Sequence, residues 1–361
     1  MTPTGLTGSV LAELGEMARA PPHARFATAA ALAVGLASLT AIWLRFADPW
    51  WAGITALACV GASRPASFAT AAARVTGTAI GAVGAWLAAP WVANHLALAP
   101  PLLLLCSTVA VLGGEVTSHK YAWVMGGVTA DLVLLGLLAD PATGGGLPLA
   151  RSAAIALGAV VALFVAWLVI PAGAPAREAP APGWPSLLGP NRYLLGHGLR
   201  TGAAVMLVPL LWSWLAVPDL SQMAISLAAV MAVPDLSSDP DQANAVLRER
   251  GHQRLAGCFL GGAAGLGALA LGLSALLPWL AILLGGVWVG ASLQASERGI
   301  GYVGRQATVA FIILMVDGFG PPLSLVPGLS RFVGIALGVG LLLALLAVWP
   351  DPRTDSGTSF P

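Results

Sequence analysis

Charged residues are scarce in this sequence of 361 residues. Only 9% of the residues are Asp, Glu, Lys or Arg, whereas 57% are hydrophobic, and the mean hydropathy is +0.84. A soluble domain carries about 25% charged residues, which cover its water-facing surface. The composition therefore excludes soluble globular and disordered classes and predicts a polytopic membrane protein.

Lysine and cysteine are also scarce, and the common catalytic motifs are missing. The single lysine, Lys120, is followed by Tyr121 and cannot complete the phosphate loop GxxxxGK[ST]. No HExxH or GxSxG motif occurs, and the three cysteines lie far apart in apolar stretches. We therefore expect no enzyme, no metal and no cofactor. The formal net charge of +1 offers no basic surface for nucleic acid.

Apolar runs alternate with short polar or Pro/Gly-rich breaks, which predicts an all-α protein of twelve segments. A helix needs about 20 residues to span the hydrocarbon core. The second and eighth segments are too short, so tilted, re-entrant or broken helices are open alternatives, and ten spans remain an option. The segments are 25–45, 50–62, 70–90, 98–113, 120–138, 150–170, 199–216, 220–233, 252–275, 279–295, 302–317 and 330–349.

The sequence repeats itself at an offset of 180 residues. Arg74-Val-Thr-Gly77-Thr-Ala-Ile-Gly81 aligns with Arg254-Leu-Ala-Gly257-Cys-Phe-Leu-Gly261, and Arg151 aligns with Arg331. This predicts two repeats of about six segments each. The expected organisation is an N-terminal tail at 1–24, a first repeat at 25–171, a Pro/Ala-rich linker at 172–198, a second repeat at 199–350 and a C-terminal tail at 351–361.

The basic residues predict the orientation in the membrane. With the N-terminus in the cytoplasm, most of the 17 Lys and Arg residues fall on the inner side, and Arg45, Arg151 and Arg331 are the exceptions. Both halves show this bias, so each half crosses an even number of times. We therefore expect parallel repeats, cytoplasmic termini and a path between the halves near the midplane.

Asp131 is the most informative single residue, because it lies well inside the apolar segment 120–138. A carboxylate at this depth costs at least about 2.5–3.5 kcal/mol, so it should face a polar cavity or a partner. One interpretation is a protonatable site that couples proton entry to substrate movement. The other is a structural acid paired with an arginine or a backbone group. The second half has Phe311 at the matching position, so the site is asymmetric.

The element Arg-x-x-Gly-x-x-x-Gly occurs in both halves. Its glycines, Gly77 with Gly81 and Gly257 with Gly261, lie one helical turn apart, so another helix can approach that face closely. Arg74 and Arg254 are expected to begin these helices on the inner side. They could attract an anionic substrate from the cytoplasm, or they could bind lipid phosphate and set the topology.

Three further arginines are candidates for anion binding. Arg305 lies about one turn into its segment, beside Gln306, and is a candidate for an inner vestibule. Arg151 and Arg331 occupy matching positions on the outer side. They could line an outer exit, although packing or headgroup contacts explain them equally well. Asp317 lies near a segment end, where we expect it to be solvated.

The first half resembles the fusaric acid resistance / aromatic acid exporter superfamily. The resemblance rests on Trp50-Trp51-Ala-Gly-Ile-Thr-Ala-Leu, on Arg64-Pro65 and on the segment from Arg74 to Gly81, and the second half carries a degraded copy at Arg254, Gly257 and Gly261. The resemblance implies a bacterial inner-membrane efflux protein for aromatic carboxylic acids, often beside a periplasmic adaptor protein. Many members carry a cytoplasmic domain, for which the linker 172–198 has no room.

We therefore expect a secondary, proton-coupled exporter of small, aromatic or related organic anions in the bacterial inner membrane. A non-transporting scaffold that binds lipid or partner proteins is the alternative, since faces rich in Gly and Ala fit both. A polar cavity between the repeats that contains Asp131 would favour the exporter. A membrane enzyme would need clustered polar side chains at one depth. A homo-oligomer is left open.

Overall fold

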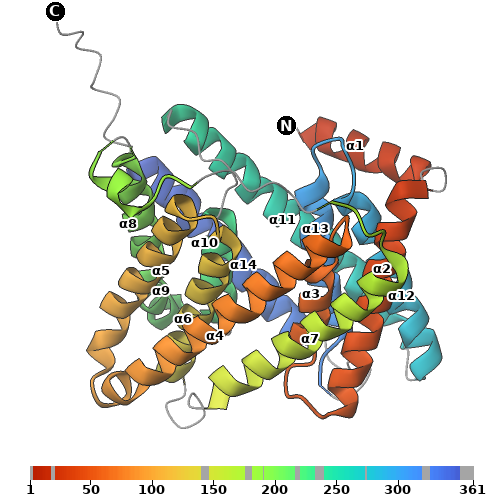
Figure 1. The fold of residues 1–361 in the computed structure, drawn as a ribbon, viewed down its shortest axis with the longest axis horizontal. Helices are drawn as coiled ribbons and strands as arrows, with labels where there is room; N and C mark the ends of the chain where they lie inside the picture. Colours follow the sequence, from red (N-terminus) through yellow and green to blue (C-terminus); the bar gives the residue numbers. More distant parts are fainter. Residues whose placement is uncertain are drawn as a thin grey trace, which may run out of the picture. The chain divides into compact units, whose positions relative to one another are not determined.

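The computed structural model describes residues 3–17, 21–139, 146–174, 181–189, 191–215, 220–231, 240–272, 275–318 and 326–349. These residues form helices, with no β-strand among them (Figure 1). The fold is all-α, as predicted. The α-helices are α1 (Pro3–Glu16), α2 (Pro21–Trp43), α3 (Trp50–Cys59), α4 (Arg64–Asn94), α5 (Ala99–Val116), α6 (Lys120–Ala139), α7 (Leu147–Val169), α8 (Tyr193–Met206), α9 (Val208–Leu215), α10 (Leu220–Met231), α11 (Pro240–Ala270), α12 (Leu276–Gln294), α13 (Gly301–Met315) and α14 (Val326–Val348).

Each predicted segment coincides with a helix, and α8 and α9 together form the seventh. Eight helices in the described part of the chain are long and apolar enough to cross a membrane. The helices α3, of 10 residues, and α10, of 12 residues, are too short. At 1.5 Å per residue, α3 is about 15 Å long, half the thickness of the hydrocarbon core. The predicted short segments are therefore short helices that do not span alone.

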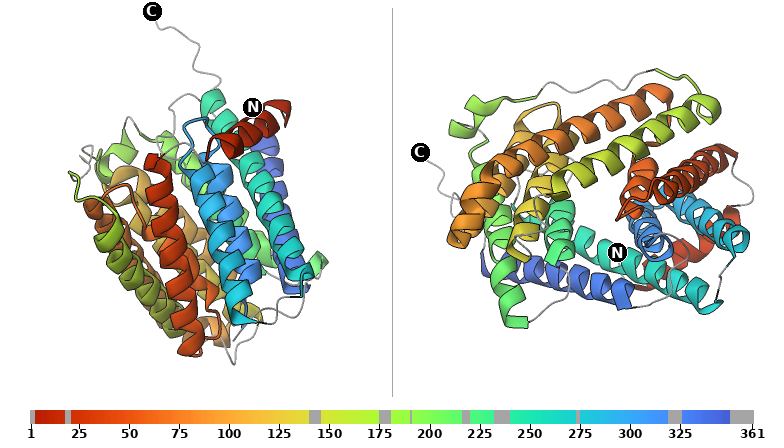
Figure 2. Two further views of the ribbon diagram at one scale, coloured as in Figure 1. Left: turned by 90° about the vertical axis from the view of Figure 1, so that its right-hand side faces the viewer. Right: turned by 90° about the horizontal axis from the view of Figure 1, so that it is seen from below.

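The chain forms two compact units that do not follow the two halves of the sequence. Unit 1 comprises Met1–Ala79, Pro148–Arg177 and Gln253–Phe332. Unit 2 comprises Ile80–Leu147, Glu178–His252 and Val333–Pro361. Each unit therefore takes helices from both predicted repeats. The two longest helices, α4 (orange) and α11 (teal) in Figure 2, are each divided between the units.

The helix lengths repeat along the chain. The helices α2 to α7 have 23, 10, 31, 18, 20 and 23 residues. The following series has 14 plus 8, then 12, 31, 19, 15 and 23 residues. The duplication and the direction of the repeats in the membrane both remain predictions.

Within each unit, four helices form a closed ring of contacts. In unit 1, α12 packs against α2 and α13, and both of these pack against α3. In unit 2, α5 packs against α8 and α6, and both of these pack against α10. The two rings use helices at matching places in the two series: α2 with α8, α3 with α10, α12 with α5, and α13 with α6.

Glycines allow the helices to approach at matching positions. A methyl group added at Gly261 would overlap the carbonyl group of Ala307, and one added at Gly81 would overlap that of Gly126. A methyl group at Gly257 would lie 2.5 Å from the Val303 carbonyl oxygen. Small residues one turn apart therefore let the backbone of α4 approach that of α6, and the backbone of α11 approach that of α13, with no side chain between them. Gly77 is buried on the same helix as Gly81.

Two predicted boundaries need correction. The tail 1–24 contains α1 and the start of α2, which begins at Pro21. The linker 172–198 contains a 3-10 helix at Trp184–Leu188 and the start of α8 at Tyr193. Leu187 of this segment packs against Leu112 and Val116, so burial of its apolar side chains explains why it is ordered. The C-terminal tail 351–361 lies outside the described residues.

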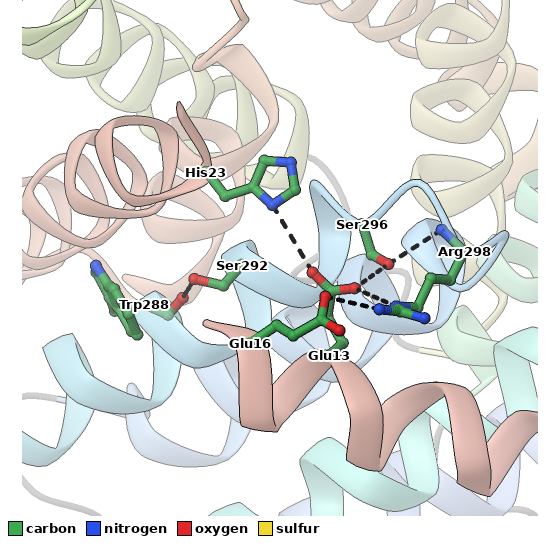
Figure 3. Close-up of polar contacts among 7 residues, drawn as sticks. All are labelled: Glu13, Glu16, His23, Trp288, Ser292, Ser296 and Arg298. Atoms are coloured by element: carbon green, nitrogen blue, oxygen red, sulfur yellow. Dashed lines mark hydrogen bonds and ion pairs between the residues drawn. The ribbon is translucent and has the colours of Figure 1, made fainter. Parts of the chain in front are cut away.

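The helix α1 is fastened to the loop between α12 and α13 by a polar cluster (Figure 3). The carboxylate of Glu13 accepts hydrogen bonds from Ser296 Oγ at 2.7 Å and Arg298 Nε at 3.2 Å, and His23 Nδ1 lies 3.7 Å away. Arg298 Nη2 also contacts Glu16 at 2.6 Å. The hydrogen bond to Glu16, with a smaller contribution from Glu13, raises the pKa of Arg298, so the arginine stays charged at any physiological pH.

We expect Gly261→Ala to destabilise the protein by about 1–3 kcal/mol, because the new methyl group overpacks the contact with α13. The adjacent Gly262→Ala is the matched control, since no atom lies within 4 Å of its added methyl group. Thermal unfolding in detergent measures the difference. Equal midpoints for the two variants would contradict the close approach.

Glu13→Gln should loosen α1 more than Glu16→Gln. The Glu13 side chain is 8% exposed and contacts His23, Ser296 and Arg298, whereas the Glu16 side chain is 58% exposed and pairs with Arg298. Exposed ion pairs contribute about 0–1 kcal/mol, while a buried polar network that loses one member costs about 1–3 kcal/mol. Limited proteolysis between α1 and α2 measures the release. Faster cleavage of the Glu16 variant would be the contrary result.

Candidate functional site

Asp131 is buried in the middle of α6 and is 1% exposed. Its Oδ2 atom accepts a hydrogen bond from Ser107 Oγ on α5 at 2.7 Å. Its Oδ1 atom is buried and has no hydrogen-bond partner, and no ion pair to Asp131 occurs within the described residues. An ionised carboxylate with one donor and no counter-ion is expensive in an apolar interior, so this group requires a proton, a water molecule or a cation.

A small cavity opens beside Asp131, inside the helix ring of unit 2. All four helices of the ring line it, and its polar members are Ser107, Asp131 and Thr201. The centre of a water molecule can occupy about 20 Å³ of this cavity, so the cavity has room for about one ordered water molecule. The cavity contains Asp131 and is lined by residues of both halves of the sequence, but most of its lining is apolar and it lies within unit 2, so a polar cavity between the repeats stays a prediction. It is too small for an organic anion in this conformation.

The ring of unit 1 has no such acid at the matching place. There, Phe311 is 4% exposed, and its ring lies directly over Gly286 of α12. It belongs to an apolar cluster that also contains Trp279 and Leu283. A bulky aromatic side chain thus occupies the position at which unit 2 has Asp131, which agrees with the asymmetry expected from the sequence.

Arg74 and Arg254 do not begin their helices, so this part of the prediction was wrong. The helix α4 starts at Arg64 and α11 starts at Pro240, because helical structure extends through polar residues that the hydropathy pattern left out. Arg74 therefore lies about 15 Å along its helix and Arg254 about 21 Å along its own. Both are buried, with exposures of 5% and 4%.

Several arginines meet one face of the short helix α3. Trp51, Thr55 and Cys59 lie four residues apart and therefore share a face. The Arg151 guanidinium stacks 3.7 Å from the centre of the Trp51 ring, and Arg74 Nε donates to Thr55 Oγ1 at 3.1 Å.

Two further electrostatic interactions involve residues at this face of α3. The Cys59 thiol lies within electrostatic range of Arg74 and Arg305, and Arg151 lies within range of Arg74. The structure thus brings together arginines that the sequence had assigned to opposite sides of the membrane.

Arg331 lies against the same tryptophan pair. Its guanidinium is 5.1 Å from the centre of the Trp50 ring, and it donates to the carbonyl oxygen of Ile313 at 3.1 Å. It also pairs with Asp317 at 3.5 Å. Asp317 therefore pairs with Arg331, and its side chain keeps the contact with solvent that we expected, since 35% of it is exposed. The guanidinium groups of Arg151 and Arg331 therefore both lie against the tryptophan pair, and a role of either at an outer exit stays a prediction.

Arg254 is joined to α13 through Gln306. Its Nη1 atom donates to Gln306 Oε1 at 2.6 Å, while its buried Nε atom has no hydrogen-bond partner. Gln306 follows Arg305, which is half-buried. Arg74, Arg254 and Arg305 therefore all belong to unit 1, whereas Asp131 belongs to unit 2.

The sequence reasoning missed Ser107, Thr201 and Gln306. Ser107 and Thr201 are single hydroxyl residues in apolar helices, and no motif distinguishes them from hydroxyls that bond to their own backbone. Gln306 was noted only as a neighbour of Arg305. No group of three or more His, Cys, Asp or Glu side chains that could hold a metal occurs in the described ranges.

Residues 18–165 match the family model described as fusaric acid resistance protein-like. This part of the chain belongs to that family. The match covers the first half, in which the Trp50-Trp51 pair and the Arg74 element carry the resemblance. The chain matches no curated protein and no solved structure. With the apolar helices, this match supports a multi-pass membrane protein and indicates a role related to transport.

The contact between Arg254 and Gln306 gives a prediction for the stability of the protein. Gln306→Leu should destabilise the protein by about 1–3 kcal/mol, because it leaves a buried guanidinium without its acceptor. The double variant Arg254→Met/Gln306→Leu should recover most of the loss, because the charge is removed with its partner. Chemical denaturation in detergent measures both. A double variant less stable than Gln306→Leu would refute this account.

Proposed function

We propose that the protein is a secondary transporter that exports small organic anions across the bacterial inner membrane in exchange for protons. The observation that carries this proposal is Asp131, a buried carboxyl group inside a candidate membrane span, which lines a cavity and has one oxygen without a hydrogen-bond partner. Ionisable groups at this depth are costly, and in membrane proteins they mark ion and proton pathways.

The environment of Asp131 favours a proton over a metal cation as the coupling ion. Apart from Asp131, Ser107 and Thr201, the lining consists of Ala, Val and Gly side chains. The Thr201 hydroxyl donates to the carbonyl oxygen of His197 at 2.9 Å. Hard cations require about six oxygen ligands, which this lining does not supply. A proton needs the carboxyl oxygen and a neighbouring water molecule only.

The arginines of unit 1 are the candidates for the substrate carboxylate. A guanidinium recognises a carboxylate through two parallel hydrogen bonds, and it stays charged in apolar surroundings. Arg305 is half-buried, and Arg254 has a free buried N–H group. The family description and the tryptophan pair make aromatic carboxylates the first class to test. A periplasmic adaptor protein, which the resemblance implies, remains a prediction.

The exchange would be driven strongly by the membrane potential. Moving one monoanion out and one proton in transfers two elementary charges in the direction that an interior-negative potential favours. Each charge contributes about 2.3 kcal/mol per 100 mV of membrane potential, so the two charges together contribute about 4.6 kcal/mol per 100 mV. A single buried acid in the ring of unit 2 suits a stoichiometry of one proton per anion.

We expect Asp131→Asn to abolish proton-driven accumulation, because the amide cannot take up and release a proton. The measurement is uptake of labelled aromatic carboxylates into inverted vesicles with an imposed pH gradient. Asp317→Asn is the control, because Asp317 pairs with Arg331 outside the cavity. Undiminished, pH-dependent flux in the Asp131 variant would remove Asp131 from the mechanism. No flux for any compound, together with no change in susceptibility of a deletion strain, would favour the scaffold.

A further inference from the structure

The helix α1 has one side docked on unit 1 and one side open. On the docked side, Val10 and the following Met17 pack against the apolar cluster of Leu293, Ile300 and Val303. The buried Glu13 holds the loop between α12 and α13 through Ser296 and Arg298. On the open side, Leu11 is 69% exposed and Leu14 is 42% exposed, and residues three apart are neighbours on a helix surface.

The open side of α1 is almost free of charge. From residue 8 to residue 16, the exposed residues are Gly8, Leu11, Ala12, Leu14, Gly15 and Glu16. Glu16 is the only charged residue among them, and it pairs with Arg298 at 2.6 Å. The polar groups of α1 thus face the protein, and its leucines face outward. Leucine side chains in water are unfavourable, so the open side requires an apolar partner.

The neighbouring membrane spans place α1 at the edge of the bilayer. The helix α12 has 19 residues and the candidate span in α2 has 21, so they are about 29 and 32 Å long, close to the 30 Å thickness of the hydrocarbon core. Each therefore ends near the edge of that core. Ser296 follows the last residue of α12 by two residues and lies within about 7 Å of it. The headgroup region of one leaflet is about 5–8 Å thick.

The start of α2 gives the same level. His23 is the first residue of the candidate span in α2, and its ring belongs to the polar cluster around Glu13 (Figure 3). Figure 2 shows α1, in dark red beside the N-terminus, running across the ends of the helices that it contacts in unit 1. Amphipathic helices that lie in the membrane interface have this orientation. Because α2 tethers α1 to the bilayer, α1 needs little affinity of its own for lipid.

We propose that α1 lies in the membrane–water interface, with Leu11 and Leu14 inserted among the lipid chains next to the headgroups. The partner of its open side is therefore the surface of the bilayer that α2 and α12 cross. Through Glu13, the interfacial helix holds the loop between α12 and α13 at the level of the headgroups. This inference does not depend on whether the protein transports an anion.

The test uses single nitroxide spin labels in the full chain, in vesicles of phosphatidylcholine and phosphatidylglycerol, after the three native cysteines are replaced by alanine. Labels at Leu11→Cys and Leu14→Cys are compared with Leu36→Cys, an exposed position within the span of α2, and with Glu297→Cys, an exposed position in the loop between α12 and α13. Oxygen concentrates among lipid chains, whereas a charged or polar nickel chelate stays in water. We expect the ratio of oxygen to nickel collisions at Leu11 and Leu14 to approach that at Leu36 and to exceed that at Glu297 severalfold.

A second measurement does not use a label. Leu11→Gln combined with Leu14→Gln should speed limited proteolysis between α1 and α2 in vesicles, because the open side loses its contact with lipid. The matched control is Ala12→Gln, since Ala12 is exposed on the same helix but has little apolar surface to bury. Equal cleavage of the two proteins would overturn the proposal.

The collision ratios separate the other possible partners. A ratio at Leu11 and Leu14 equal to that at Glu297 would place the open side in water and overturn the proposal. Broadening of the spectra that disappears on dilution with unlabelled protein would show that a second copy of the chain covers the leucines, which would also overturn it.

Discussion

A charged side chain inside a bilayer must be stabilised by the protein, because hydrocarbon supplies neither water nor counter-ions. This constraint governs the arrangement of the buried polar groups described here. Arg74 bonds to Thr55, Arg254 to Gln306, and Asp131 to Ser107, each across a contact between two helices. Every such pair fixes the register of one helix against another, so the few polar residues of this apolar chain also define its packing.

The helix rings explain how two similar sets of helices support different chemistry. In the ring of unit 1, Phe311 lies over Gly286 and completes an apolar core. In the ring of unit 2, Asp131 and Ser107 leave a cavity at the matching place. The α3 helix of unit 1 begins with Trp50 and Trp51, whereas α10 of unit 2 begins with Leu220 and Ser221. A few substitutions thus distinguish the two rings without changing the backbone arrangement.

The sequence predicted the helices and the buried acid Asp131, but it did not predict which side chains contact the arginines. Hydropathy locates apolar segments well, because burial and lipid contact require the same residues. Hydropathy cannot locate a helix end that lies in a polar stretch. The predicted starts of α4 and α11 therefore lie C-terminal to the observed ones, and Arg74 was placed at a membrane boundary. The grouping into units was equally hidden, because it depends on which repeat each helix packs against, and local sequence carries no record of that choice.

A hydroxyl group rather than an arginine holds the carboxyl group of Asp131, and this has a physical consequence. A guanidinium within about 4–6 Å of a carboxyl group strongly favours the ionised form, and a carboxylate held in this way no longer exchanges protons near neutral pH. An arginine beside Asp131 would therefore convert a proton site into a fixed ion pair. Ser107 instead donates one hydrogen bond and supplies no charge, which is the arrangement that the proposed proton exchange requires.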